Sequence, residues 1–296
     1  MRAYRVAYDG RPYFGFQRQP DVPTVEDTLF DALADLGVHD PDDPKPVGYA
    51  AAGRTDAGVS AVAQTVAFDA PKWLTPRAVC SELPGDVRVW AAADVPDDFH
   101  ATHDAARRVY RYHLHAPDAS LDRARDAAVA LSGEHDFRNL TTDDTGTVRD
   151  VSVEVYRDRS SDSDRSSDRG GNTDSDSGGD DEFLVLRVAA GGFPREFVRR
   201  LASVVRGVAV GDTDRGRVDE VLGAERLAGP AGIAAAPPEP LVLVGVDYPG
   251  VAFAADPPAV ETIRDVFGER RVDGVVRARV ARDVLDGVSA PETERG

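Results

Sequence analysis

Residues 47–68 read VGYAAAGRTDAGVSAVAQTVAF, which is two small apolar runs on either side of the turn GRTDAG. Both runs have the composition of β-strands, and the two glycines give the turn the backbone freedom that a tight connection needs. The sequence therefore predicts two strands that hold a loop at 53–58. Because loops on rigid scaffolds often carry catalytic groups, Asp56, close to Arg54, is a candidate for one.

The same loop also has a purely structural interpretation. Thr55 and Asp56 can hydrogen-bond nearby backbone groups, as these residue types commonly do in turns. The bare pattern Gly-x-x-Asp-x-Gly favours this structural interpretation. The functional one needs support from the rest of the chain.

Outside the loop, the chain mixes strand and helix patterns. Alternating or compact apolar runs predict strands at 2–8, 47–52, 59–68, 86–95, 107–115, 147–157, 182–189 and 240–248. Helices are predicted to open at Thr24, at Asp118 and near Pro194, with an irregular segment at 132–140. The order strand, helix, strand, strand is consistent with two mixed halves.

The strand at 107–115 has two chemically different faces. Side chains alternate along a strand, so one face carries Tyr110, Tyr112 and Leu114. The opposite face carries Arg107, Val109, Arg111 and His113. We expect Tyr112 to be a core residue.

The helix predicted after Pro194 is also two-sided. Its apolar stripe, which predicts packing on a sheet, consists of Phe197, Leu201, Val204, Val205 and Val208. The opposite side is basic and is expected to face solvent or a cleft; it carries Arg195, Arg199 and Arg206.

The formal net charge of −17 argues against nucleic acid as a partner, since RNA-binding proteins usually carry an excess of Lys and Arg. Lysine, however, occurs only at positions 45 and 72, while Asp and Glu together number 52. We interpret this balance as adaptation to concentrated salt, in which net charge keeps a protein soluble. At about 1 M salt the Debye length is about 3 Å, so local arginines would decide whether RNA binds.

Cysteine and histidine usage predicts neither a disulfide nor a metal site. Cys80 is the single cysteine, and it is expected to be a buried small hydrophobe. The histidine pairs at 100 and 103 and at 113 and 115 lack an accompanying set of cysteines or carboxylates. Neither a membrane-spanning stretch nor a signal peptide is predicted, so we expect a soluble cytoplasmic protein.

Two segments stand apart from these patterns. Residues 158–182 contain only Asp, Glu, Arg, Ser, Gly, Asn and Thr, and are predicted to be a disordered acidic loop between neighbouring antiparallel strands. Residues 250–296 include Ile263, Val266, Phe267, Val275, Val276 and Val280. Because such side chains are usually buried, we expect them to pack on the rest of the protein.

Further motifs support the functional interpretation of Asp56. The run after the loop continues through Ala61, Gln64, Val66 and Phe68, and companion motifs occur at 8–10, 14–19, 83–86, 97–101, 110–112, 197–200 and 246–249. In their order over residues 1–249 these motifs resemble the TruA family of tRNA pseudouridine synthases. One departure is Ser60, where the family usually carries histidine, which bears on RNA contacts there and not on Asp56.

The resemblance implies the fold and its division into domains. The expected fold class is α+β, with two mixed α/β subdomains, a joined and largely antiparallel sheet flanked by helices, and a central basic cleft. The expected domains are 1–105, which holds the catalytic loop, and 106–249, which holds the acidic insert. Residues 250–296 are an extension to which the resemblance gives no role.

The resemblance also implies the chemistry. The expected reaction isomerises uridine to pseudouridine in the tRNA anticodon stem-loop, at positions 38, 39 or 40, with no cofactor or metal. Asp56 is the implied catalytic aspartate. Arg199 is its implied cationic partner, which a carboxylate in a desolvated pocket needs in order to stay ionised.

RNA binding is implied for a second group of residues. Tyr110 is expected to stack on the target uracil, and Arg54 to support the flipped nucleotide. The candidates for contacts with the RNA backbone are Arg11, Arg18, Arg107 and Arg111, with Phe14 and Phe16 as flanking contacts.

The partners expected from the resemblance are tRNA and a second copy of the chain in a homodimer, without a membrane. Two alternatives stay open. One is a catalytically silent tRNA-binding or chaperone protein that uses the same cleft. The other is a glycosidic-bond hydrolase, which normally uses two carboxylates, whereas the motif around Asp56 contains no acidic partner.

Overall fold

The computed structural model describes residues 1–157, 183–229 and 232–289, so the predicted acidic loop lies outside the described residues. The strands are β1 Arg2–Tyr8, β2 Ala50–Ala51, β3 Ser60–Phe68, β4 Val87–Asp94, β5 Arg107–His115, β6 Gly133–Asp136, β7 Val148–Arg157, β8 Phe183–Ala190, β9 Leu241–Asp247 and β10 Ala254–Ala255. The α-helices are α1 Val25–Asp35, α2 Pro76–Cys80, α3 Leu121–Leu131, α4 Phe197–Val210, α5 Gly216–Val221 and α6 Pro257–Ser289.

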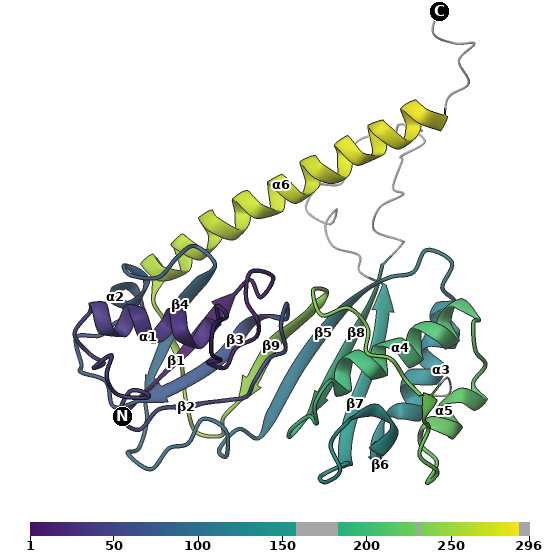
Figure 1. The fold of residues 1–296 in the computed structure, drawn as a ribbon, viewed down its shortest axis with the longest axis horizontal. Coiled ribbons are helices and arrows are strands. Elements are labelled where there is room, and N and C mark those ends of the chain that lie inside the picture. The colour runs from purple at the N-terminus through teal and green to yellow at the C-terminus, as the bar shows by residue number, and fades with distance from the viewer. Residues whose placement is uncertain (158–182, 230–231, 290–296) are drawn as a thin grey trace, which may run out of the picture.

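The strands form a single ten-stranded sheet in the order β10-β4-β1-β3-β9-β5-β8-β7-β6, with β2 paired to β3 (Figure 1). Among the described strands, every pairing is antiparallel except that of β3 with β9. Helix α1 covers one half of the sheet, and α3 and α4 cover the other half. The predicted α+β class with a joined, largely antiparallel sheet is confirmed.

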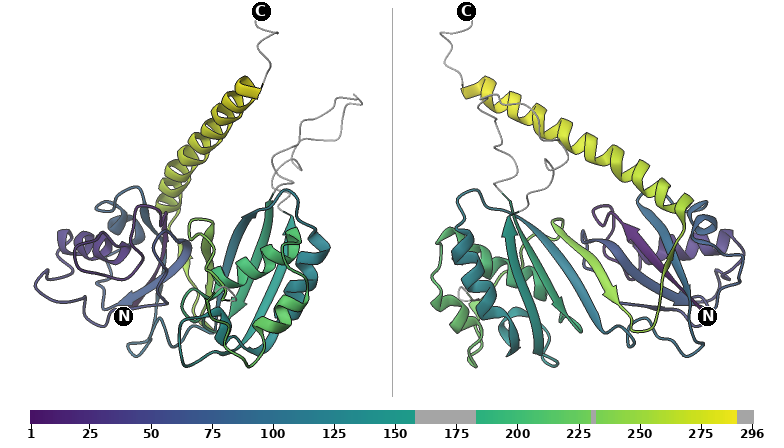
Figure 2. Two further views of the ribbon diagram at one scale, coloured as in Figure 1. Left: turned by 45° about the vertical axis from the view of Figure 1, so that its right-hand side comes forward. Right: turned by 180° about the vertical axis from the view of Figure 1, so that it is seen from behind.

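The two halves of the sheet meet at the parallel pair β3–β9. This contact is short, since only Ser60 faces Val242 and Ala61 faces Leu243. On its other side β9 pairs antiparallel with β5, so a strand from late in the chain lies in the middle of the sheet (Figure 2). The start of β3 is also the end of the 53–58 loop, which places that loop at the junction of the halves.

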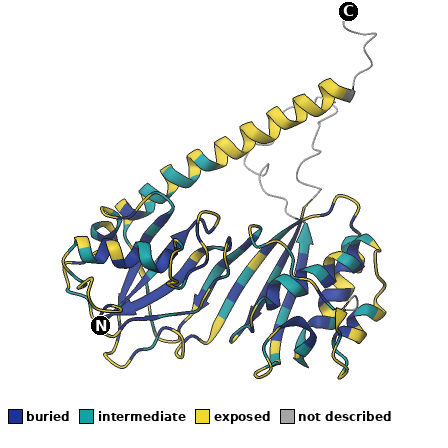
Figure 3. Cartoon of the chain, in the orientation of Figure 1, coloured by how far each residue is buried: buried dark blue, intermediate teal, exposed yellow. Residues whose placement is uncertain are grey.

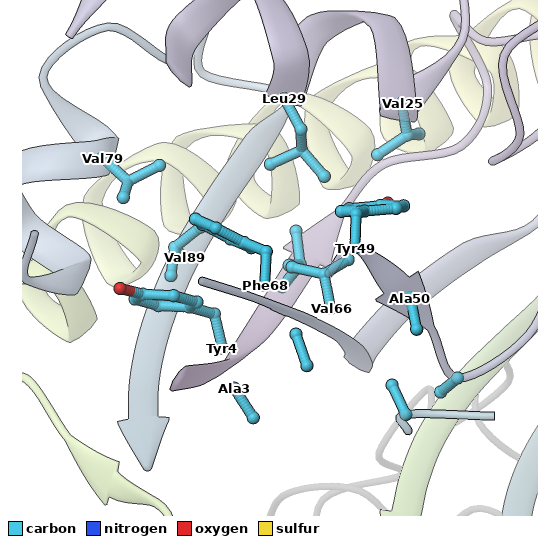
Figure 4. Close-up of a cluster of buried hydrophobic side chains, with 14 of the residues drawn as sticks. Ala3, Tyr4, Val25, Leu29, Tyr49, Ala50, Val66, Phe68, Val79 and Val89 are labelled. Atoms are coloured by element: carbon cyan, nitrogen blue, oxygen red, sulfur yellow. The ribbon is translucent and has the colours of Figure 1, made fainter. Parts of the chain in front are cut away.

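Each half has its own hydrophobic core. In the N-terminal half, Leu29 of α1 packs over Tyr4, Val66 and Phe68 of the sheet, and the rings of Tyr4 and Phe68 stack at 5.2 Å (Figure 4). Each such side chain contributes about 1.5–3 kcal/mol on burial. The second core lies between α3, α4 and strands β5, β7 and β8. Each half of the sheet is thus packed on its own core, while the domain boundaries at residues 105 and 249 stay predictions.

Several local predictions were wrong. The strand expected at 47–52 is reduced to β2, and the segment expected to be irregular at 132–140 contains β6, because that strand pairs with β7. Pro194 lies before α4 and not in its first turn, since Glu196 adopts a left-handed conformation with φ 57° and the helix begins at Phe197. Tyr112 is buried in the second core, as predicted.

The C-terminal residues form α6, a 33-residue helix that contacts β4 and α2 at its beginning and then leaves the body of the protein (Figure 3). Ile263, Val266 and Phe267 are half-buried, but residues 271–288 are all exposed. The expectation that Val275, Val276 and Val280 pack on the protein was therefore wrong. No helix in the described ranges combines the length and apolarity needed to cross a bilayer.

Candidate active site

The 53–58 loop is fixed at both ends by backbone hydrogen bonds. The amide of Ala52 donates to the carbonyl of Thr65 at 2.8 Å, and the amide of Val59 donates to the carbonyl of Asp56 at 3.1 Å. The side chain of Gln64 donates from Nε2 to the carbonyl of Gly53 at 2.8 Å. The strand after the loop thus determines the path of the loop.

A second set of contacts comes from the segment after β1. The hydroxyls of Tyr8 and Thr55 share a hydrogen bond of 2.8 Å, and the amide of Phe16 donates to the carbonyl of Thr55 at 3.1 Å. Gly15 has φ +104°, and a Cβ there would lie 3.0 Å from the same carbonyl, so the close approach requires glycine. Phe16 is buried against Tyr8, so its expected role as an RNA contact was wrong.

Gly10 and Ser60 form a related close contact. A Cβ on Gly10 would lie 2.1 Å from the carbonyl oxygen of Val59, which excludes any side chain at this position. The amide of Gly10 donates to Oγ of Ser60 at 3.0 Å. The residue that departs from the family pattern therefore supports the backbone beside the loop.

Asp56 and Arg199 come together across the two halves of the sheet. Nη1 of Arg199 lies 3.1 Å from Oδ2 of Asp56, with 15% of the arginine side chain and 38% of the aspartate side chain exposed. Nε of the same guanidinium donates to the carbonyl of Ala236 at 2.7 Å. The guanidinium thus contacts the carboxylate of Asp56, and the carbonyl of Ala236 fixes the direction of the arginine.

The start of α4 brings Arg199 to this place. Glu196 holds the left-handed conformation that turns the chain into the helix, and its carboxylate accepts a hydrogen bond from Nη2 of Arg200 at 2.6 Å. Oε1 of Glu196 also lies 3.9 Å from Nη1 of Arg199. A non-glycine residue with positive φ is uncommon, and here it lies next to the ion pair.

Tyr110 of β5 forms part of the cleft wall near Asp56. Its ring meets that of Phe193 edge-on at 5.4 Å, and Phe193 stacks on Phe197 at 5.7 Å. Burial raises the pKa of the Tyr110 phenol far above its ordinary value; the charge of Arg108 opposes this shift and that of Asp56 adds to it. The phenol is therefore neutral at any physiological pH.

A cleft of about 1480 Å³ surrounds Asp56 and Tyr110 and is lined by both halves of the protein. Its charged lining consists of Arg18, Lys45, Arg54, Arg108, Arg195 and Arg199 against Glu26, Asp56 and Glu196. In a chain with a net charge of −17, this cleft is locally positive. The predicted basic cleft is confirmed.

The predicted RNA-contacting residues divide between this cleft and other surfaces. Arg54 is exposed in the cleft lining, and so is Phe14, with 55% of its surface accessible. Arg18 also lines the cleft, but it forms an ion pair with Asp27 at 2.8 Å. Arg11 lies outside the lining and pairs with Asp9 at 2.7 Å.

Arg107 and Arg111 lie on the face of β5 opposite to Tyr110. Both are exposed, and neither belongs to the cleft lining. Their contact with RNA stays a prediction, and it would require the RNA to reach the other side of the sheet.

Sequence reasoning missed Arg108 and Lys45 in the cleft. The alternation of side chains along β5 was sufficient to find Arg108, since this residue lies two positions before Tyr110 and therefore on the same face. Lys45 is exposed and comes from the loop before β2, and no sequence pattern marks it.

Comparison with known proteins shows what the chain is similar to. A family model described as tRNA pseudouridine synthase matches residues 127–249. A tRNA pseudouridine synthase A from Haloarcula marismortui is 52% identical over 298 residues, covering 97% of this chain and 100% of the relative. One from Halobacterium salinarum is 53% identical over 283 residues, covering 95% of this chain and 97% of the relative.

A solved structure of a Cbf5-Nop10-Gar1 complex is also similar, at 16% identity over 70% of this chain and 54% of that chain, with a TM-score of 0.33. The two sequence relatives come from halophilic archaea, which fits the salt adaptation inferred from composition. Their identity over nearly the full length carries the conclusion: the chain belongs to the TruA family of tRNA pseudouridine synthases, isomerases that act on uridines of tRNA.

Proposed function

We propose that the enzyme modifies uridines of the anticodon stem-loop, at positions 38, 39 or 40, and that Asp56 is its catalytic carboxylate. The observation that carries this proposal is the ion pair of Asp56 with Arg199, at 3.1 Å, inside a basic cleft and near Tyr110. A positive lining suits a polyanion in an otherwise acidic protein, and a half-buried carboxylate suits the sugar of a single extruded nucleotide.

The chemistry assigned to Asp56 follows from the bonds that change. The N-glycosidic bond of the uridine breaks, the electron pair stays with the uracil, and the anomeric carbon becomes electron-deficient. After the base has turned, its carbon C5 forms the new bond to that anomeric carbon and then loses its proton, and N1, freed when the glycosidic bond broke, takes up a proton in exchange. A carboxylate can stabilise the electron-deficient carbon or bond to it during the rotation, and the 3.1 Å contact with Arg199 orients the carboxylate of Asp56.

Tyr110 supplies a surface for the extruded base. Its phenol is neutral, and Phe193 supports its ring from the edge. Base–aromatic stacking contributes about 1–3 kcal/mol per base, enough to offset much of the cost of unstacking a nucleotide. Arg54, which is exposed on the same cleft, is placed to meet a phosphate next to that nucleotide.

A glycosidic hydrolase would need a second carboxylate free to act on water. Glu196 lines the cleft, but its Oε2 accepts a hydrogen bond from Nη2 of Arg200 at 2.6 Å, and its Oε1 lies 3.9 Å from Nη1 of Arg199. Because the Glu196 carboxylate is engaged by these two arginines, the site favours isomerisation, in which the base is retained. Release of free uracil from tRNA would support hydrolysis instead.

The resemblance to the family also motivates a proposal for assembly and location. We propose a homodimer that works in the cytoplasm on tRNA. Light scattering of the purified chain in concentrated potassium chloride measures its mass, and a monomeric mass would contradict the dimer.

The test of the proposed function is pseudouridine mapping on unmodified tRNA in high salt. Wild-type protein is expected to produce pseudouridine at positions 38 to 40, and Asp56→Asn is expected to produce none while still binding tRNA. Asp212→Asn is the matched control, because Asp212 also pairs with an arginine, Arg206, but on the exposed surface. Product at other positions alone would refute the assigned stem-loop, and product from Asp56→Asn would refute the assigned carboxylate.

A further inference from the structure

Two arginines connect the halves of the protein, one on each face of the sheet. Arg5 of β1 donates from Nη2 to the carbonyl of Val246 in β9 at 2.6 Å, and from Nη1 to Oγ1 of Thr65 at 2.8 Å. Its guanidinium also lies 4.0 Å from the ring centre of Phe253. Arg108 of β5 makes the corresponding connection on the cleft face.

All five N–H donors of Arg108 are used by backbone carbonyls. Nε and Nη2 donate to Ala52 at 3.1 and 2.6 Å, and Nη2 donates to Thr102 at 2.7 Å. Nη1 donates to Ala105 at 3.4 Å and to Gly191. Because a guanidinium has five donors, none is left for a phosphate, although the residue lines the cleft.

The carbonyls held by Arg108 lie at the bases of the two catalytic segments. Ala52 directly precedes the 53–58 loop that carries Asp56. Gly191 directly follows β8 and begins the segment that leads into α4 and Arg199. One planar group thus joins the bases of two segments whose far ends meet in the Asp56–Arg199 ion pair.

We propose that Arg108 is a positioning residue for the isomerisation: it fixes the 53–58 loop against the 191–196 segment, so that Asp56 and Arg199 meet in the working geometry. This inference rests on the proposed role of Asp56. A displacement of about 1 Å at a reacting group can cost about a hundredfold in rate, so the rigidity of these bases controls turnover. Since Arg108 has no donor for RNA, substrate affinity does not depend on it.

Arg5 provides the matched control for this role. It also bridges the halves through carbonyls, but it does so on the face away from the cleft and holds neither catalytic segment. Lysine at either position keeps the charge and loses the planar fork, so it cannot hold carbonyls from both halves at once. The pair Arg108→Lys and Arg5→Lys therefore separates positioning from simple stability.

The experiment measures kcat, KM and tRNA affinity for both variants in concentrated potassium chloride. Pseudouridine formed at any position of the tRNA is counted as product. We expect Arg108→Lys to lower kcat by about ten- to a hundredfold with KM and affinity within about twofold of wild type. We expect Arg5→Lys to lower the melting temperature and to keep kcat per folded molecule. Equal losses of kcat in both variants, wild-type kcat in Arg108→Lys, or a raised KM with normal kcat each overturn the proposal.

A second measurement uses the wild-type enzyme and covers the case in which Arg108→Lys does not fold. Hydrogen exchange is followed while salt is lowered. Amides of 53–58 and 191–196 are expected to lose protection together, before the β1–β3 ladder opens, because one side chain holds both segments. Independent loss of protection in the two segments would overturn the proposal. A different result would contradict the proposed function: pseudouridine formation by the Asp56→Asn variant.

Discussion

The two faces of β5 carry similar residues in different situations. On the cleft face, Arg108 and Tyr110 are half-buried: Arg108 donates to the carbonyls of Ala52 and Gly191, and the ring of Tyr110 meets that of Phe193. On the other face, Arg107 and Arg111 are exposed and lie outside the cleft lining. Residue type cannot distinguish Arg108 from Arg107 and Arg111, but position along the strand does, because a shift of one residue moves a side chain to the opposite face. In this enzyme the side of the sheet determines whether an arginine of β5 reaches the cleft.

The strongest test of this contrast removes the cationic partner of the carboxylate. Arg199→Gln is expected to lower turnover by about a hundred- to a thousandfold, the scale typical of losing one group that stabilises charge in an active site. Arg206→Gln is the control from the same helix, because Arg206 is exposed and pairs with Asp212. Single-turnover kinetics on unmodified tRNA measure both. Normal turnover in Arg199→Gln would remove the ion pair from the mechanism.

A second test concerns the aromatic side chain of the cleft face. Tyr110→Ala is expected to lower kcat/KM by about ten- to a hundredfold, as the loss of stacking on one base implies. Tyr110→Phe should stay close to wild type, since the buried phenol is neutral and only the ring stacks. Steady-state kinetics measure kcat/KM for the two variants and for wild type. A large loss in the phenylalanine variant would show that the hydroxyl takes part.

A third test compares arginines on the two faces directly. Arg54→Gln is expected to raise KM several-fold and to reduce the salt dependence of binding by about one phosphate contact. Arg111→Gln is expected to have a smaller effect, because RNA seated in the cleft reaches the opposite face only by passing the sheet edge. Binding titrations across a salt series measure both slopes. An equal or larger effect of Arg111→Gln would extend the RNA-binding surface around the sheet.

The smallest expected effect concerns an ion-pair group outside the cleft. Asp9 is buried and contacts Arg11 at 2.7 Å and Arg270 of α6 at 2.8 Å, while Arg270 also contacts Asp86. Burial alone would raise the pKa of Asp9, but the hydrogen bonds and charge of Arg11, with the charge of Arg270, leave this pKa below its ordinary value.

A lowered pKa in the folded state means that the Asp9 carboxylate stabilises the fold above the unfolded pKa of about 4 and loses this effect as the pH falls further. We expect the melting temperature of wild type to fall by a few degrees more than that of Asp9→Asn between pH 7 and pH 3. Thermal melts at the two pH values measure the difference. Parallel losses would show that the pairs with Arg11 and Arg270 do not contribute.

Sequence patterns predicted the parts of the site that depend on local spacing. The 53–58 loop, the face of Tyr110 and the side of α4 that carries Arg199 all follow from strand or helix periodicity, and the structure brings the three residues to one cleft. The roles of these residues stay proposals. Motif order was needed to recognise that segments more than a hundred residues apart meet.

Other features could not be predicted because they depend on distant backbone. The five bonds of Arg108 reach carbonyls from four separate positions in the chain, and no spacing rule reveals them. The left-handed turn at Glu196 has no glycine to mark it, so the start of α4 was misplaced. The exposure of Val275 and Val276 contradicts the general tendency of valine to be buried.

The position of β9 has a consequence for biosynthesis. This strand, residues 241–247 of a 296-residue chain, lies between β3 and β5 and is the only described strand that pairs with both. Each half can form its own core as it leaves the ribosome, since domains and subdomains tend to fold in the order of synthesis. We infer that the 53–58 loop and α4 face each other only after β9 has been made and inserted. A nascent or prematurely terminated chain that lacks β9 would therefore have no assembled active site.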